Sequence, residues 1–214
     1  MPTIAYKNKA GERVPSQSTI KSQIGWSTRP LLYWANAQGL EGRTLKEAQD
    51  TATVSGTIAH HLIECFIRDT EPDLSSYSEE DIEKGRSAFS NFEHWWFRVD
   101  VDPVYVEPNL VSEEWQFGGT PDLVCYVSGE FSIVDWKSGK WYEDGFLQLA
   151  AYRQLVEENC PFSVKAFHIL RIPRNEDPPS FKHLYFQGLP FGSWEAFECA
   201  LKLHKLQKIL KEKL

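Results

Sequence analysis

The chain has 214 residues, of which 42% are hydrophobic and 25% charged. These are ordinary proportions for a globular protein and allow one well-buried core, so we expect residues 1–214 to form a single domain. No apolar run approaches the roughly 20 residues of a bilayer-spanning helix. The N-terminus lacks the apolar stretch and cleavage site of a signal peptide, which favours a cytoplasmic location.

The net charge of −7 is unusual for a protein that binds nucleic acid, because basic side chains provide most of the affinity for phosphate. Bound divalent cations would, however, offset clustered carboxylates. Basic residues also concentrate near the C-terminus, where one glutamate accompanies Lys202, Lys205, Lys208, Lys211 and Lys213. Charge therefore neither indicates nor excludes a DNA substrate.

The four cysteines are far apart in the sequence, at Cys65, Cys125, Cys160 and Cys199. No close Cys pair exists, so the spacing of a zinc ribbon is absent. We interpret all four as reduced structural thiols of a cytosolic chain.

The first half of the chain favours helices. Residues 1–18 are polar and are expected to be loose. A short helix is predicted after Pro30 and ends at Gly39, and a second is predicted over residues 55–68. Ser78, with Asp81 three residues later, predicts the start of a third helix.

The second half favours strands rich in Val, Ile, Tyr, Phe and Trp. Turn residues separate predicted strands at 104–107, 111–117, 120–127 and 131–137. A helix over 145–158, strands at 163–171 and 180–187, and a helix from Trp194 onward follow. This order predicts an α/β (α+β) fold, in which helices pack on a mixed sheet.

Two acidic residues and a lysine converge on one end of a predicted hairpin. Ser128-Gly129 fits a two-residue turn, because Gly accepts the positive φ that such turns require. This turn pairs Val127 with Glu130, and the same register places Asp122 opposite Asp135. Lys137 lies two residues beyond Asp135, so its side chain emerges on the same face.

This triplet suits phosphodiester hydrolysis, because carboxylates select Mg²⁺ or Mn²⁺ and a nearby lysine can assist a metal-bound water. An ordinary surface salt bridge is the alternative interpretation. His60 and Glu64 share a helix face at i, i+4 and could add an imidazole and a carboxylate. Gln148 and Tyr152 have the same spacing on the helix that follows the lysine. Each of these pairs could also belong to an ordinary packed helix.

Taken together, these motifs resemble those of RecB-like nucleases of the PD-(D/E)XK superfamily. The resemblance rests on residues 56–64, 118–122, 134–139 and 148–152. In addition, Ser18-Thr19 followed by Leu31–Ala35 is similar to the start of small phage-type exonucleases. The resemblance implies an αβββαβ core with additional N-terminal and C-terminal helices.

The resemblance also implies roles for individual residues. Two Mg²⁺ or Mn²⁺ ions would be held by His60, Asp122, Asp135 and the backbone carbonyl of Trp136. Lys137 would be the catalytic lysine, Glu64 would bind metal directly or through water, and Gln148 and Tyr152 would support the site. DNA contacts would come from Trp26, Trp34, Tyr152 and Lys140. Glu107 aligns with a family acid but, like Glu113 and Glu114, is left outside the candidate site.

Some relatives carry an iron–sulfur cluster held by closely spaced cysteines, which are missing here, so we expect no cluster. The resemblance implies a DNA exonuclease of recombination, repair or replication, encoded by a phage or prophage and located in the interior of a bacterial cell. A recombinase, single-strand-binding protein or helicase would be a separate chain. The alternatives are a non-catalytic DNA-binding or assembly subunit and a restriction-type endonuclease.

Overall fold

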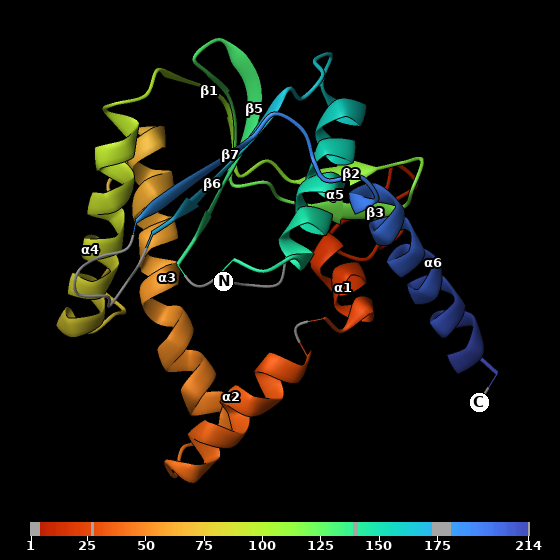
Figure 1. Ribbon diagram of the computed structural model, residues 1–214, viewed down its shortest axis with the longest axis horizontal. Coiled ribbons are helices and arrows are strands. Elements are labelled where there is room, and N and C mark those ends of the chain that lie inside the picture. The colour runs from red at the N-terminus through yellow and green to blue at the C-terminus, as the bar shows by residue number, and fades with distance from the viewer. Residues whose placement is uncertain (1–4, 27, 139–140, 173–180, 214) are drawn as a thin grey trace.

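The computed structural model describes residues 5–26, 28–138, 141–172 and 181–213 (Figure 1). In chain order the elements are α1 (Gln17–Lys21), the 3-10 helix η1 (Ser22–Ile24), α2 (Thr28–Leu40), α3 (Leu45–Arg68), α4 (Glu79–Trp96), β1 (Val101–Val106), β2 (Leu110–Ser112), β3 (Phe117–Gly119), β4 (Leu123–Val127), β5 (Glu130–Lys137), α5 (Asp144–Asn159), β6 (Ala166–Arg171), β7 (Lys182–Phe186) and α6 (Ser193–Lys211). None of the helices formed by these described residues combines the length and hydropathy that a bilayer-spanning helix requires.

A five-stranded mixed sheet in the order β1-β4-β5-β6-β7 forms the centre of the molecule. Within this sheet β5 and β6 are parallel neighbours, and α5 makes the crossover between them. Strands β2 and β3 form a separate two-stranded ribbon between β1 and β4 in the sequence. The order α3, β1, β4, β5, α5, β6 confirms the predicted αβββαβ core, to which α4, β7, α6 and the N-terminal helices are added.

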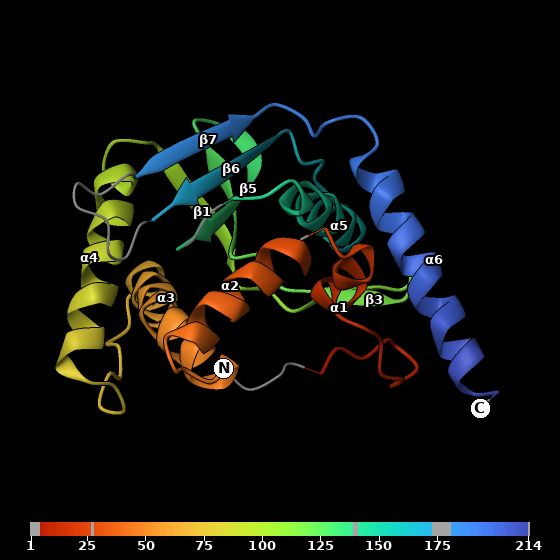
Figure 2. The same ribbon diagram turned by 60° about the horizontal axis from the view of Figure 1, so that its bottom comes forward.

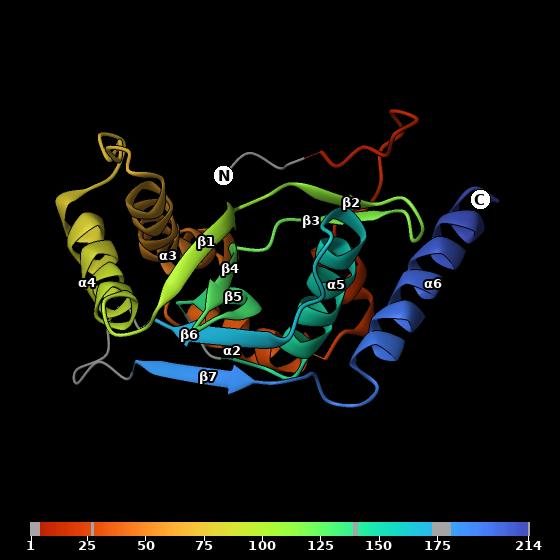
Figure 3. The ribbon, with the colours of Figure 1, turned by 90° about the horizontal axis from the view of Figure 1, so that it is seen from above.

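Helices cover both faces of this sheet. Successive side chains of β5 point to opposite faces and so contribute to both hydrophobic cores. Ile133 faces the core formed with α5 and α6, whereas Val134 and Trp136 face the core formed with α3 and α4. All three side chains are fully buried. Burying an apolar side chain of this size contributes roughly 1.5–3 kcal/mol. Figure 3 shows α3 and α4 on one side of the strands and α5 and α6 on the other.

The predicted register of the hairpin is confirmed. Val127 pairs with Glu130 and Leu123 with Val134. Ser128 and Gly129 both have positive φ values, of 50° and 83°, as a type I′ turn requires. The last pair of this ladder therefore lies directly beside Asp122 and Asp135.

The helix predicted over residues 55–68 begins ten residues earlier, at Leu45. Thr44 and Glu47 form a capping box there, a stronger start signal than the sequence Ser55-Gly56-Thr57. The extended α3 packs closely on α4 at Gly85, where an added Cβ would lie 2.4 Å from Ile58 Cγ2.

The single strand predicted over residues 111–117 was also wrong. A turn at residues 113–116 divides it into β2 and β3. Ser112 caps this turn, because its Oγ accepts a hydrogen bond from Trp115 N at 2.9 Å and its carbonyl accepts one from Gln116 N at 2.9 Å. Gln116 has a positive φ of 60°, which ends the extended conformation.

The described part of the N-terminal segment is packed, not loose as expected. Residues 5–16, here called the N-terminal loop, fold back through a bridge between Lys7 and Arg13. Val14 is buried, and Ser16 makes a parallel bridge with Gly118. Ser16 then caps α1, whose Ile20 is fully buried in the core of α5 and α6.

A histidine pair, of which His168 is buried and His183 is exposed, connects β6 with β7. His168 is 3% exposed, and its Nδ1 lies 2.8 Å from His183 Nε2. The ring of Trp95 from α4 packs against His183 with centroids 5.6 Å apart. Burial and the neighbouring His183 lower the pKa of His168 to about 4.

This histidine predicts a loss of stability in acid. The pKa of His168 is lower in the folded state than in the unfolded state. The neutral histidine therefore contributes fully to the free energy of unfolding above about pH 6.5, and this contribution is lost as the pH falls toward 4. The loss should reach about 3 kcal/mol. Urea unfolding at several pH values should show an acid loss of stability that is about 3 kcal/mol smaller in His168→Leu than in the wild type, because the other buried histidine with a lowered pKa, His60, is present in both proteins. His94→Leu, a change of an exposed histidine on α4, should retain the wild-type profile. Parallel profiles for the wild type and His168→Leu would contradict the prediction.

Candidate functional site

Asp135 is the centre of the candidate site. Its side chain is fully buried near the end of β5. Lys137 Nζ lies 2.8 Å from Asp135 Oδ1 and 2.6 Å from Oδ2. Gln148 Nε2 from α5 donates to Oδ1 at 3.2 Å. The carboxylate is therefore fixed by one ammonium group and one amide.

Gln148 and Tyr152 lie together, as their spacing predicted. Gln148 Nε2 also donates to the Tyr152 hydroxyl at 2.9 Å, so both hydrogens of the amide are used. Gln17 Nε2 from α1 lies 3.4 Å from the same hydroxyl. Burial and the charges of Asp135 and Asp122 raise the pKa of Tyr152 well above its usual value, so the phenol stays neutral.

Asp122 lies next to Asp135, just before β4 begins. Its Oδ2 accepts a hydrogen bond from the backbone N–H of Trp136 at 3.0 Å, which anchors it to the end of β5. Burial raises the pKa of Asp122, while Lys137 and the Trp136 N–H act in the opposite direction. The pKa of Asp135 rises to about 6, mainly through burial, with Asp122 adding to the rise and Lys137 opposing it. Two neighbouring acids thus share the charge of one lysine.

Lys137 remains an ammonium ion in this arrangement. Burial alone would lower its pKa, but the adjacent charges of Asp135 and Asp122 outweigh burial and raise it. Its side chain is 29% exposed, so it also reaches toward solvent at the end of the sheet.

His60 approaches the same strand end from α3. Its ring packs edge-on against the Trp136 indole, with centroids 5.8 Å apart. Burial and Lys137 lower the pKa of His60 to about 4, although Asp135 and a hydrogen bond to the Trp136 backbone act to raise it. The imidazole is therefore neutral near pH 7, the form that binds metal ions.

The donor set suits a hard divalent cation. Carboxylate and carbonyl oxygens are the ligands that Mg²⁺ and Mn²⁺ prefer, and the neutral imidazole adds one nitrogen donor. The buried Asp135 Oδ2 has the ion pair to Lys137 but no hydrogen-bond partner among the described residues, so it keeps capacity for a cation. As arranged, no three His, Cys, Asp or Glu side chains in the described ranges converge on one metal position. Metal binding would therefore require these side chains to draw together.

Glu107 also lies beside the site, although it was left outside the candidate residues. Its backbone N–H donates to the Asp122 carbonyl at 3.0 Å, and its φ is 45°, an uncommon value for a glutamate. Burial, Asp122 and Glu64 raise its pKa to about 7, while Arg68 acts in the opposite direction. The pairing of Val106 with Leu123 explains why Glu107 lies here, because the next residues outward on the two strands are Glu107 and Asp122.

Among the described residues, the predicted site residues Glu64, Trp26 and Trp34 form no hydrogen bond or ion pair with Asp122, Asp135 or Lys137. Glu64 forms an ion pair with Arg68 at 2.9 Å. Trp26 is exposed, and Trp34 is half-buried on α2, which runs between α1 and α3 in Figure 2. Lys140 lies outside the described residues.

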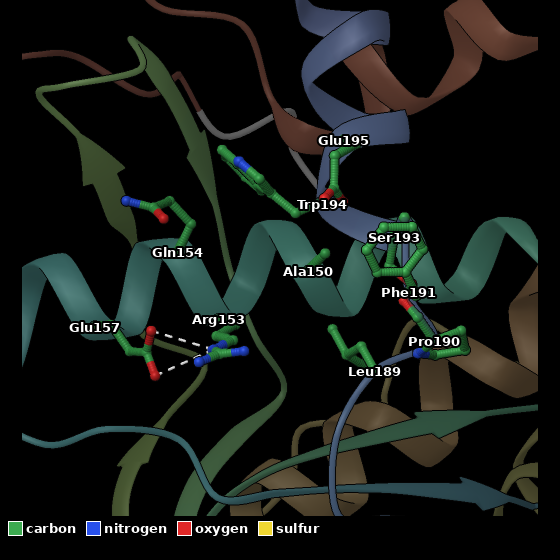
Figure 4. Close-up of a pocket in the computed structure, with 11 residues that line it drawn as sticks. Ala150, Arg153, Gln154, Glu157, Leu189, Pro190, Phe191, Ser193, Trp194 and Glu195 are labelled. Atoms are coloured by element: carbon green, nitrogen blue, oxygen red, sulfur yellow. Dashed lines mark hydrogen bonds and ion pairs between the residues drawn. The ribbon is translucent and has the colours of Figure 1, made fainter.

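A pocket of about 370 Å³ lies between α5 and the loop that leads into α6 (Figure 4). Arg153 and Glu157 form an ion pair in its wall, with Nε donating to both carboxylate oxygens at 3.2 Å. None of the candidate site residues lines this pocket. It is therefore distinct from the group around Asp135.

Comparisons with known proteins give one match that covers most of the chain. The family model described as the PD-(D/E)XK nuclease superfamily matches residues 29–213. No curated protein matches the chain.

Two solved structures are similar to this chain. A protein assigned as an exonuclease from Eubacterium rectale has 12% sequence identity and a TM-score of 0.46, with 81% of this chain and 71% of that chain covered. LHK-Exo in complex with dAMP has 13% identity and a TM-score of 0.40, with 74% and 84% covered. TM-scores below 0.5 are too low for either neighbour to indicate what this chain does. The family match spans α3 to α6, all the strands and the residues Asp122, Asp135, Lys137 and Gln148, and on this basis the chain belongs to the PD-(D/E)XK nuclease superfamily.

Proposed function

We propose that this protein is a divalent-metal-dependent deoxyribonuclease that hydrolyses DNA phosphodiesters as an exonuclease. The observation that carries the proposal is the buried Asp135, held by Lys137 and Gln148 and flanked by Asp122, in a member of a nuclease superfamily. A buried acid with a raised pKa beside a second acid is typical of a functional site.

The ligands of the metal would be His60, Asp122, Asp135 and the backbone carbonyl of Trp136. When bound, Mg²⁺ or Mn²⁺ would lower the pKa of a water and offset charge on the scissile phosphate. Two ions fit the number of donors.

The chain's own side chains would hold and neutralise the reacting groups. The Lys137 ammonium, next to Asp135, can donate to a phosphate oxygen and stabilise its growing negative charge. Gln148 donates to Asp135 and is itself held by the Tyr152 hydroxyl. These contacts orient the Asp135 carboxylate before the reaction begins. Glu64, which forms an ion pair with Arg68, would bind metal directly or through a water.

The biological setting that fits such an activity is DNA recombination, repair or replication in a phage-infected or bacterial cell. A recombinase, a single-strand-binding protein or a helicase would act as a separate chain. The aromatic side chains of Trp26 and Trp34 would contact the substrate by stacking on bases.

The test is hydrolysis of end-labelled single-stranded and double-stranded DNA. We expect degradation with Mg²⁺ or Mn²⁺ and its complete loss with EDTA, because the carboxylates alone cannot activate water at neutral pH. A ladder that shortens from one end indicates an exonuclease, whereas discrete internal fragments indicate a restriction-type endonuclease. DNA binding without hydrolysis under all metal conditions would overturn the proposal and favour a non-catalytic binding subunit.

A further inference from the structure

Three adjoining cavities lie along the C-terminal half of α6, two of them between this helix and the N-terminal loop. Their volumes are about 460, 430 and 180 Å³, and His204 and Lys208 line all three. Figures 2 and 3 both show the N-terminal loop and the end of α6 at the same side of the molecule. We call this surface the basic groove and define it by Arg13, Ser16, Thr19, His204, Lys208 and Lys211.

The helical side of the groove is one face of α6. His204, Lys208 and Lys211 follow each other at i, i+4 and i+7, so they lie in a row that extends about 10 Å along the helix axis. Lys202 points to the opposite side of the same helix, because two residues before His204 is more than half a turn away. The row is therefore a feature of one face and not of the whole helix.

Basic side chains outnumber acidic ones along the groove. No ion pair to a carboxylate is formed by Arg13, Lys208 or Lys211 in the described parts of the chain. Two acids also line the cavities, Glu212 and Glu12, and the latter accepts a hydrogen bond from Asn8 Nδ2 at 3.0 Å.

His204 provides a second, independent observation. Its Nδ1 atom is buried and has no hydrogen-bond partner among the described residues. The groove thus combines unpaired cations with an unsatisfied ring nitrogen in a chain whose net charge is −7.

The groove adjoins the candidate site through α1 and the N-terminal loop. Ser16 and Thr19 line the groove, while Gln17 points inward to the Tyr152 hydroxyl at 3.4 Å. Tyr6 also lines the groove, and its hydroxyl lies 2.8 Å from Thr120 Oγ1, two residues before Asp122. A hydrogen-bonded path through Gln17, Tyr152 and Gln148 therefore connects this wall of the groove with Asp135.

We propose that the basic groove binds the phosphate backbone of the DNA strand that extends from the candidate site. This inference rests on the proposed function, because it takes DNA as the substrate. Lysine, arginine and hydroxyl side chains contact phosphates without reading the sequence. One strand of a duplex rises about 3.4 Å per nucleotide, so the row from His204 to Lys211 matches about three nucleotides. The groove would hold long substrates and contribute nothing to very short ones.

The experiment compares Lys208→Glu with Lys202→Glu, a matched charge reversal on the opposite face of α6. Each is tested on an end-labelled dinucleotide and on an end-labelled strand of about 40 nucleotides. Lys208→Glu should raise KM for the long strand about tenfold. The slope of log KM against log salt concentration should fall by the amount that corresponds to about one phosphate contact. Hydrolysis of the dinucleotide should not change, and Lys202→Glu should match the wild type on both substrates.

Equal KM values and equal salt dependence for the two variants on the long strand would overturn the inference. If the wild type hydrolyses neither substrate, the proposed function fails and the groove is tested separately, by fluorescence anisotropy of the labelled long strand in EDTA. Weaker binding by Lys208→Glu than by Lys202→Glu would then support the groove, and equal binding would exclude it. Thermal melting of both variants identifies any effect that comes from unfolding.

Discussion

Asp135→Asn should reduce DNA hydrolysis by about 10³-fold or more, which is the largest loss that we expect from a single substitution. The asparagine keeps the shape of the side chain and can still contact Lys137 and Gln148. It removes the negative charge that would bind the metal ion and balance the Lys137 ammonium. The measurement is the single-turnover rate on end-labelled DNA with saturating Mg²⁺ or Mn²⁺.

The same substitution should leave the stability of the fold nearly unchanged. Burial raises the pKa of Asp135 to about 6, so the folded protein holds this ionised carboxylate at a disadvantage near pH 7. A neutral isostere removes that disadvantage and loses the ion pair, and these two effects oppose each other. Asp102→Asn, on the exposed side of β1, is the matched control and should keep full activity. Wild-type activity in Asp135→Asn would show that the hydrolysis comes from another site or another enzyme.

Lys137→Gln is the second substitution with a large expected effect, a fall in kcat of about 10²- to 10⁴-fold. The ammonium would no longer stabilise charge on the phosphate, while the acids and the imidazole that bind metal stay in place. KM for DNA should change little, because Lys137 contributes one of many phosphate contacts. Steady-state rates at several DNA concentrations separate the two parameters.

Metal binding gives an independent readout of Lys137. Its ammonium lies 2.6 Å from Asp135 Oδ2 and competes with any cation for that carboxylate. Calorimetric titration with Mn²⁺ without DNA should therefore show tighter binding to Lys137→Gln than to the wild type. Lys165→Gln, a change of an exposed lysine just before β6, should affect neither the rate nor the Mn²⁺ affinity. A Lys137→Gln rate within a few-fold of the wild type would remove Lys137 from the proposed mechanism.

The core of the site was predictable because its geometry is local. A two-residue turn fixes the register of β4 and β5, and the register in turn fixes which residues lie beside Asp135. Similarly, the i, i+4 spacing of Gln148 and Tyr152 places both on one face of α5, whose position is set by the crossover from β5 to β6. Neither inference required knowledge of a distant part of the chain.

Glu107 could not be placed from the sequence in the same way. The register of β1 and β4 shifts by one residue between Pro103 and Tyr105, where a bulge interrupts the ladder. Without this shift, Glu107 would not lie opposite Asp122. Bulges depend on the packing of both strands and leave no local turn signal, so the pairing of this acid became visible only in the structure.

The packing of the N-terminal loop was likewise invisible in the sequence. Its few apolar residues are spread among polar ones, and its order comes from single contacts to distant segments. Lys9 N donates to Glu113 Oε1 at 2.8 Å, and Asn8 Nδ2 donates to Gln116 Oε1 at 2.8 Å. Such contacts across more than 100 residues have no periodicity that a sequence reading could detect.

The bulge in β1 has a further consequence for the outside of the sheet. In the described residues β1 pairs only with β4, so its other side is an open edge that could recruit a strand from another molecule. Pro103 offers no N–H to such a partner, and the bulge twists the backbone just beyond it. The irregularity that places an acid beside Asp122 thus also protects the sheet from edge-to-edge aggregation.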